Sequence, residues 1–219
     1  MFEFKISTDK FSLPSDASEV TLGQFLKLRE ADANDHISQL SVLMNVNKED
    51  INLLSTKYSK QILNAIKLTQ VLIQDLQAFF ESDVYLVPPK EVKLMDKIVR
   101  IPQDLQKEPF WPSRKVKEII QDKLKETGSG NEFDLTDKAA DVIAHYLYFP
   151  YTGRPYNEYQ AEEFKEVILD LPITEAMPLA TFFFLKWKPL YLTRWSCFLV
   201  ALRIWRKKLA LKYSINMKT

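Results

Sequence analysis

The feature that most restricts the fold of this sequence is a long apolar stripe with helical spacing, which ends at residue 80. Its members follow one another at intervals of three, four or seven residues: Ile62, Ile66, Ile73, Leu76 and Phe80. Residues with this spacing share one face of an α-helix, and that face is normally buried against other elements. We therefore expect a helix that starts at Ser55 or Thr56, reaches Phe80 and occupies the centre of a helical bundle.

Local signals predict further helices on both sides of the stripe. Thr21 and Gln24 have the spacing of a capping box, in which each side chain accepts a hydrogen bond from the backbone of the other residue. The remaining expected features are, in chain order, a helix from Ser113, a loop over residues 150–155, a helix from Thr174 and a last helix from Pro189 to about Tyr213.

Two short regions of the chain have the pattern of β-strands instead. Alternation of apolar and polar residues predicts a strand over residues 2–6 and argues against a secretory signal there. Apolar residues predict two more strands, near 92–94 and 98–101. We expect these three strands to pair in one small sheet and residues 8–20 to form a loop.

Together these signals predict a mostly α fold in which two helical sub-bundles are joined by a small β-sheet and a proline-rich segment. Prolines at positions 102, 109 and 112 keep the stretch after the strands irregular. The expected divisions are an N-terminal strand and helical bundle (1–82), a connector (83–113) and a C-terminal helical bundle with a basic apolar tail (114–219).

The composition excludes several kinds of site. Of the 219 residues, 46% are hydrophobic and 27% are charged, which is typical of a folded globular chain rather than a disordered one. The single cysteine excludes an intrachain disulfide and a cysteine-based zinc site, and the two histidines argue against a multi-histidine metal site. We therefore expect no metal and no cofactor.

No sequence pattern indicates catalysis. The chain lacks GxSxG, HExxH, GxGxxG and Walker A motifs. His145 follows Asp141 by four residues, a spacing that brings both to one helix face, and we expect an ion pair on the helix surface. Cys197 lies in an apolar segment and is interpreted as a buried apolar residue rather than a catalytic thiol. The sequence therefore predicts a protein that is not an enzyme and has no small-molecule substrate.

A segment between residues 146 and 159 is rich in tyrosine and contains Arg154. Tyrosine and arginine are enriched in protein-recognition surfaces, which makes Tyr151 and Tyr156 candidate partner-binding residues. The alternative interpretation is a rigid loop between helices that is packed by its own rings.

The C-terminal end of the chain carries a strong charge asymmetry. The last 44 residues contain nine basic residues and no acidic one, whereas the other 21 basic residues face all 29 acidic residues. Tryptophans alternate with basic residues there: Trp187, Lys188, Arg194, Trp195, Trp205 and Arg206. Three alternatives stay open for this tail: packing against the body or a partner protein, binding to an anionic membrane surface, or binding to nucleic acid. Between Leu179 and Trp205 the longest uncharged stretch, Trp195–Leu202, is too short to span a membrane.

Six segments of the chain carry a resemblance to a known family. They are residues 21–28 (TLGQFLKL), the 35–46 helix, 47–51 (NKEDI), 97–105 (KIVRIPQDL), 144–156 and 171–176 (LPITEA). In these segments the chain resembles small helical accessory proteins of tailed bacteriophages, of the tail-assembly-chaperone type. The tail after Lys186 is not part of the resemblance.

The resemblance implies a non-enzymatic morphogenesis protein that binds another tail or virion protein during assembly, in the host cytoplasm, with the virion as a second location. The candidate partner-binding residues are Tyr151, Tyr156, Trp187, Arg194, Trp195, Trp205 and Arg206. The alternative function is a structural or cargo component of the virion, whose basic C-terminal helix within residues 186–212 contacts nucleic acid or an anionic membrane.

Overall fold

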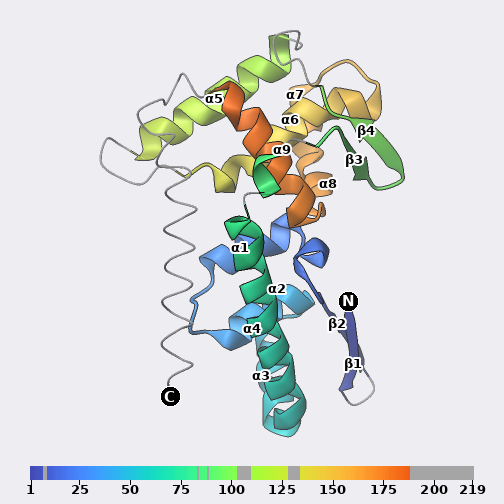
Figure 1. The fold of residues 1–219 in the computed structure, drawn as a ribbon, viewed down its shortest axis with the longest axis vertical. Helices are drawn as coiled ribbons and strands as arrows, with labels where there is room; N and C mark the ends of the chain where they lie inside the picture. The colour runs from blue at the N-terminus through green and yellow to red at the C-terminus, as the bar shows by residue number, and fades with distance from the viewer. Residues whose placement is uncertain (7–8, 83, 88, 103–109, 128–133, 188–219) are drawn as a thin grey trace.

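The computed structural model describes residues 1–6, 9–82, 84–87, 89–102, 110–127 and 134–187, and these residues are mostly α-helical, as predicted (Figure 1). The first half comprises β1 (Phe2–Ile6), β2 (Asp9–Leu13), the 3₁₀ turn η1 (Ala17–Glu19), α1 (Leu22–Glu30), α2 (His36–Met44), α3 (Lys48–Lys57) and α4 (Ser59–Glu81). The second half comprises η2 (Val84–Leu86), β3 (Glu91–Leu94), β4 (Lys97–Arg100), α5 (Phe110–Thr127), η4 (Thr136–Lys138), α6 (Ala139–Thr152), α7 (Glu158–Glu163), α8 (Lys165–Leu169) and α9 (Ile173–Lys186).

The start of α1 confirms the predicted capping box. Thr21 Oγ1 accepts a hydrogen bond from the Gln24 amide at 3.1 Å, and Gln24 Oε1 accepts one from the Thr21 amide at 3.0 Å. The Gln24 side-chain amide also donates to the Leu43 carbonyl at 2.9 Å. These bonds satisfy backbone groups at helix ends and tie the start of α1 to the end of α2.

The long helix α4 confirms the predicted central helix, although it begins at Ser59 rather than at Ser55 or Thr56. Its buried face follows helical spacing: Ile62, Ala65, Thr69, Leu72, Ile73, Leu76 and Phe80. The helix starts later because the backbone of Tyr58 is not helical (φ −128°, ψ 47°), so that the preceding residues complete α3. The Phe80 ring packs against Phe25 of α1, with ring centroids 5.2 Å apart.

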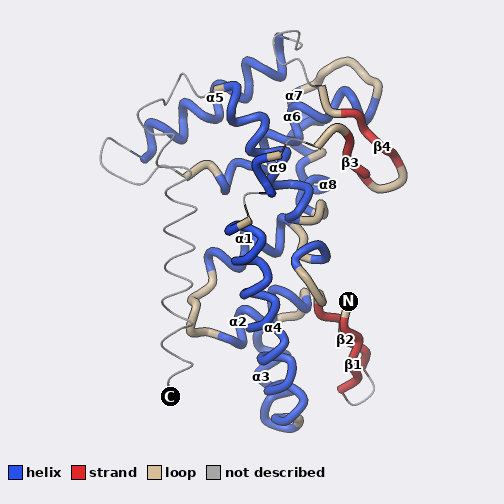
Figure 2. Tube along the Cα trace, in the orientation of Figure 1, coloured by secondary structure: helices blue, strands red, loops and turns tan. Residues whose placement is uncertain are grey.

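The strands form two separate hairpins, so the expected single sheet is wrong (Figure 2). β1 pairs antiparallel with β2, and β3 pairs antiparallel with β4. The strand β2 lies where a loop was expected, because buried Leu13 beside exposed Ser12 belongs to a short β-alternation. Pairing between strands that are neighbours in sequence closes a shorter loop, and therefore costs less entropy, than pairing β1 with the distant β3 and β4.

Helix α6 is the central helix of the second half. Almost every residue from Ala139 to Tyr148 is buried, and α5, α7, α8 and α9 all pack against this helix. α6 continues through Pro150 to Thr152 and is followed by Gly153 as its C-cap, whose positive φ of 67° suits glycine. The loop expected from residue 150 therefore begins only at Gly153.

Two other helix starts differ from expectation by a few residues. α5 begins at Phe110 rather than at Ser113, since Pro112 in the first turn lacks only an amide hydrogen that would have no helical partner. α9 begins at Ile173 rather than at Thr174. The last helix predicted from Pro189 lies outside the described residues.

A short backbone bridge joins the two halves of the protein. The Leu22 amide donates to the Leu171 carbonyl, and the Ile173 amide donates to the Val20 carbonyl, both at 2.7 Å. Helix α1 consequently packs against α8 and α9. Buried side chains from both sides of the predicted divisions at residues 82 and 113 belong to one continuous core.

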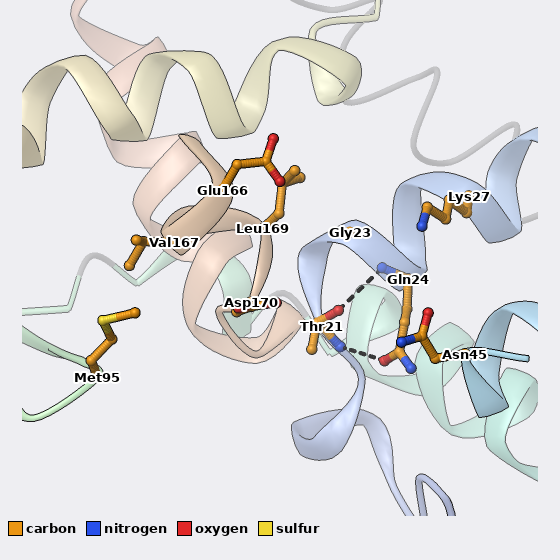
Figure 3. Close-up of a pocket in the computed structure, with 10 residues that line it drawn as sticks. All are labelled: Thr21, Gly23, Gln24, Lys27, Asn45, Met95, Glu166, Val167, Leu169 and Asp170. Atoms are coloured by element: carbon orange, nitrogen blue, oxygen red, sulfur yellow. Dashed lines mark hydrogen bonds between the residues drawn. The ribbon is translucent and has the colours of Figure 1, made fainter. Parts of the chain in front are cut away.

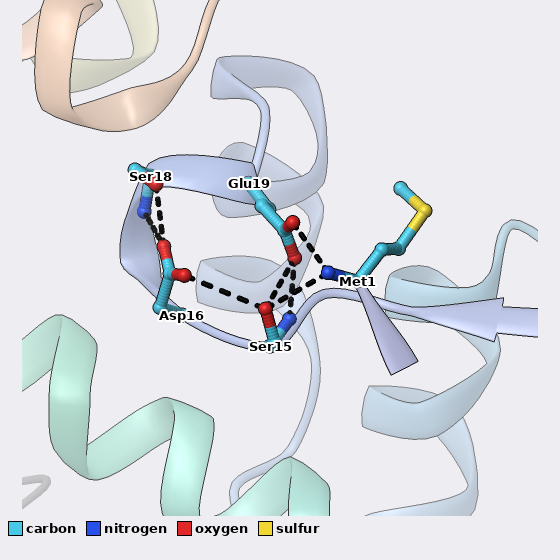
Figure 4. A network of polar contacts seen from close by, with 5 residues as sticks. All are labelled: Met1, Ser15, Asp16, Ser18 and Glu19. Carbon is cyan, nitrogen blue, oxygen red and sulfur yellow. Dashed lines mark hydrogen bonds and ion pairs between the residues drawn. The ribbon is translucent and has the colours of Figure 1, made fainter. Parts of the chain in front are cut away.

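A polar network holds the turn η1 beside the start of β1 (Figure 4). The Glu19 carboxylate accepts hydrogen bonds from the amide and the hydroxyl of Ser15, both at 2.7 Å, and from the Met1 amino group. Asp16 accepts a hydrogen bond from the Ser18 amide at 2.8 Å. The network therefore fixes the path of the chain between the first hairpin and α1.

Removing the capping hydroxyl tests this helix start. We expect Thr21→Ala to lower the free energy of unfolding by about 1 kcal/mol, because the Gln24 amide loses its acceptor. Thr21→Ser keeps the hydroxyl and should change the free energy of unfolding by less than about 0.5 kcal/mol. Urea unfolding followed by circular dichroism measures both variants. Equal midpoints for Thr21→Ala and the unsubstituted protein would contradict the role of the cap.

Candidate functional site

The tyrosine-rich segment is built around a buried histidine in α6. His145 exposes only 2% of its surface, and its Nδ1 lies 2.9 Å from the hydroxyl oxygen of Tyr156. A tyrosine hydroxyl and one nitrogen of neutral imidazole form a matched hydrogen-bonding pair. Because Tyr156 lies in the loop after α6, this hydrogen bond fastens that loop to the helix.

The charged groups near this pair come from two other helices. Lys115 of α5 forms ion pairs with Glu158 and Glu162 of α7, with a distance of 3.4 Å to Glu162. Burial lowers the pKa of His145 below its usual value, and the Lys115 ammonium group acts in the same direction. Burial also raises the pKa of Tyr156 to about 12. Both groups are therefore neutral at pH 7.

The expected surface ion pair between His145 and Asp141 is wrong. The histidine points into the core, while the Asp141 carboxylate lies 2.8 Å from Nζ of Lys165 in α8. The four-residue spacing placed the two side chains on neighbouring positions of one helix, but α6 is buried on almost all sides. An aromatic hydroxyl in the next loop therefore became the partner of His145.

Tyr151, the other candidate of this segment, also contacts the protein's own side chains. Its ring stacks on Phe164 with centroids 5.0 Å apart, and Lys97 Nζ lies 4.8 Å from the centroid of the Tyr151 ring. The structure thus brings Tyr151 and Tyr156 into one packed segment. This arrangement matches the rigid-loop alternative.

Trp187, the last described residue, is also attached to the core. Its indole Nε1 donates to the Tyr146 hydroxyl at 3.0 Å, and the Tyr146 ring stacks on Phe183 with centroids 4.3 Å apart. Trp187 is half-buried. The other candidates of the tail, Arg194, Trp195, Trp205 and Arg206, lie outside the described residues.

An apolar groove lies between β2 and α3, where sequence reasoning placed no site. It has a volume of about 370 Å³ and is lined by Phe11, Val46, Asp50, Leu53 and Leu54. Leu53 exposes 70% of its surface. The signal in the sequence was the adjacent pair Leu53 and Leu54 in a short helix, because neighbouring residues of a helix point about 100° apart and an apolar stripe one residue wide covers only one of them.

A second, more polar cleft lies between the two halves (Figure 3). Its volume is about 420 Å³, and its charged residues come from α1 (Lys27) and from α8 and its end (Glu166 and Asp170). Thr21 and Gln24 also line it, but their side chains are engaged in the capping box. The Thr21 hydroxyl thus serves as a helix cap and is not paired with a base, as a nucleophilic hydroxyl would be.

The described residues offer neither a metal site nor a membrane span. Within them, no group of three or more histidine, cysteine, aspartate or glutamate side chains is arranged to hold a metal ion. No helix in the same ranges is long and apolar enough to cross a membrane.

The buried histidine predicts a pH dependence of stability. As the pH falls from about 7.5 to about 5.5, the unfolded chain takes up a proton on His145 near the usual histidine pKa of about 6.5. In the folded protein the lowered pKa of His145 resists this protonation. The unfolded state therefore binds more protons, and the free energy of unfolding decreases as the pH falls. Urea unfolding at several pH values in this interval measures the decrease.

Matched histidine variants isolate this contribution. His145→Gln should remove it, because glutamine does not titrate, whereas His36→Gln should leave it unchanged, because that substitution keeps His145 and its contact with Tyr156. If the unsubstituted protein and His145→Gln lose stability equally between these pH values, His145 is not the group responsible.

Substitution of Trp187 tests whether its ring belongs to the core. We expect Trp187→Ala to lower the free energy of unfolding by about 2 kcal/mol, less than for a fully buried tryptophan. Trp187→Phe keeps an aromatic ring but loses the donor to Tyr146, and should cost about 1 kcal/mol. Urea unfolding midpoints measure both. An unchanged midpoint for Trp187→Ala would mean that the ring is available to a partner.

Comparison of the chain with protein-family models, with curated proteins and with solved structures finds no match.

Proposed function

We propose that this chain is a non-enzymatic protein of tailed-phage morphogenesis that binds another tail or virion protein during assembly, in the host cytoplasm. The observation that carries the proposal is the open apolar groove beside α3, next to a leucine that is largely exposed. Apolar surface that stays exposed on a soluble protein often marks an interaction site. The resemblance of several segments to proteins of the tail-assembly-chaperone type supports the phage setting.

The groove favours an amphipathic helix that carries a basic residue beside a large apolar one. Phe11, Val46 and Leu54 supply apolar walls, while Asp50 adds a carboxylate and Glu49 is exposed at the preceding position. Helices dock into such grooves through apolar side chains spaced three or four residues apart. The acidic rim selects partners with a complementary charge.

A second candidate function is favoured by the charge of the tail. Residues 188–219 contain eight basic residues and no acidic one. A structural or cargo component of the virion would use residues 186–212 to bind nucleic acid or an anionic membrane. Such binding would weaken steeply as the salt concentration rises.

A groove variant tests the first function. The intact tagged protein and its Leu53→Asp variant are used to capture proteins from phage-infected cells, and the captured proteins are identified by mass spectrometry. We expect one tail or virion protein to be bound by the original protein. The variant should lose about tenfold or more of this binding, because a carboxylate would be buried in an apolar contact. The affinity of the purified pair is then measured by calorimetry.

Ile98→Asp provides a matched control. Ile98 exposes 68% of its surface, almost the same as Leu53, but lies on β4 in the other half of the protein. It should leave the captured protein bound. Equal loss in both variants would contradict a binding site in the groove. Salt-sensitive recovery of nucleic acid, or of anionic vesicles, in place of a protein would instead support the second function.

A further inference from the structure

We propose that residues 188–219 of this chain occupy the apolar groove beside α3 in the free protein and compete there with the partner. The competition rests on the proposed function, whereas the docking of the segment does not. The segment combines the two features that the groove favours, namely large apolar residues and basic residues next to them.

The segment carries a regular apolar stripe. Large apolar residues recur in it at intervals of three or four throughout: Tyr191, Trp195, Phe198, Leu202, Trp205, Leu209 and Tyr213. This spacing is typical of one face of an amphipathic helix. Two of the tryptophans have an arginine as their direct neighbour in sequence, at Arg194 and Arg206. An anchor of this composition matches an apolar groove with an acidic rim.

The charges of the segment and of the body are complementary. Residues 188–219 contain eight basic residues and no acidic one, whereas residues 1–187 contain the other 22 basic residues and all 29 acidic residues. Asp50 lies on the wall of the groove, and Glu49 is exposed beside it. Neither forms an ion pair with another described residue. Both carboxylates can therefore face the arginines of the segment.

The segment is long enough to reach the groove from a fixed starting point. Trp187 is held on the core through Tyr146, and 32 residues follow it. As an α-helix they would extend over about 48 Å, at 1.5 Å for each residue. A globular body of this size has a radius of gyration of about 16 Å. The length of the segment therefore does not prevent docking in the other half of the protein.

If residues 188–219 stayed uncovered, the free protein would expose a large apolar surface. Seven large apolar residues along one helix face would form a patch larger than the few hundred Å² that soluble monomers usually expose. Docking on the groove covers part of this patch together with Leu53. A partner would then bind only the fraction of molecules in which the groove is open, so its apparent affinity would be reduced by that fraction.

The single cysteine of the chain lies inside the segment and provides the test. A nitroxide spin label on Cys197 of the intact, isotope-labelled protein broadens the amide signals of nearby residues in NMR spectra. We expect broadening at Val46, Asp50 and Leu53, and none at Ile98. Leu53→Asp should abolish the broadening at the groove, whereas Ile98→Asp should leave it unchanged. The remaining amide signals of each variant report whether it is folded.

Several results would overturn the proposal. Broadening at other residues, or at none, would place the segment elsewhere. Docking on a second copy of the protein is tested with a mixed sample. One portion of this sample carries the spin label but no isotopes, and the other carries the isotopes but no spin label. Broadening in this mixture would mean that the segment docks on a second copy rather than on its own chain.

A second pair of substitutions separates this inference from the proposed function. Combined Trp195→Ala and Trp205→Ala substitutions in the intact chain should raise the affinity for the captured partner by roughly threefold or more, because the groove is open more often. If they abolish capture, the tryptophans contact the partner directly and the internal competition is wrong. If the spin label reports docking but no partner protein is captured, the docking stands and the proposed function fails.

Discussion

The backbone bridge between residues 20–22 and 171–173 is the constraint on which the rest of the structure depends. Two hydrogen bonds of 2.7 Å join the chain at the points where α1 and α9 begin. Close approach is allowed by Gly23, since an added Cβ would lie 3.3 Å from the Leu169 carbonyl oxygen. Because the starts of both helices are fixed at one place, the two halves share one core and leave the polar cleft of Figure 3 beside their junction.

The second half of the protein packs aromatic side chains that carry a polar atom at one end. The Tyr156 hydroxyl meets His145 Nδ1, and Trp187 Nε1 donates to the Tyr146 hydroxyl, so both tyrosine hydroxyls have a hydrogen-bond partner within the protein. The same residue types are enriched at recognition surfaces, which is why the sequence alone leaves both interpretations open. Neutral partners suit this location, because a charged group buried without a counterion would be costly.

Short sequence patterns predicted the helices and strands better than the contacts that these elements make with one another. The capping box at Thr21 and Gln24 and the apolar stripe of α4 depend on residues a few positions apart, and the structure confirms both. The pairing of β1 with β2 and the inward direction of His145 depend on competition between distant segments, which a short sequence window does not contain. The groove beside α3 went unpredicted for the same reason, since it needs a β2 strand where a loop was expected.

The short helix α3 leaves a large apolar side chain exposed at the groove. Ile51 is fully buried, whereas Leu53, two positions later and therefore on nearly the opposite side of the helix, is 70% exposed. Helices α2 and α4 both pack on α3, yet Leu53 stays uncovered. The C-terminal segment carries more large apolar residues than an exposed chain tolerates, and its charge is opposite to that of residues 1–187. Contact between the segment and the groove would cover apolar surface on both and pair opposite charges. A partner that replaces the segment must therefore offer an equivalent basic, apolar surface.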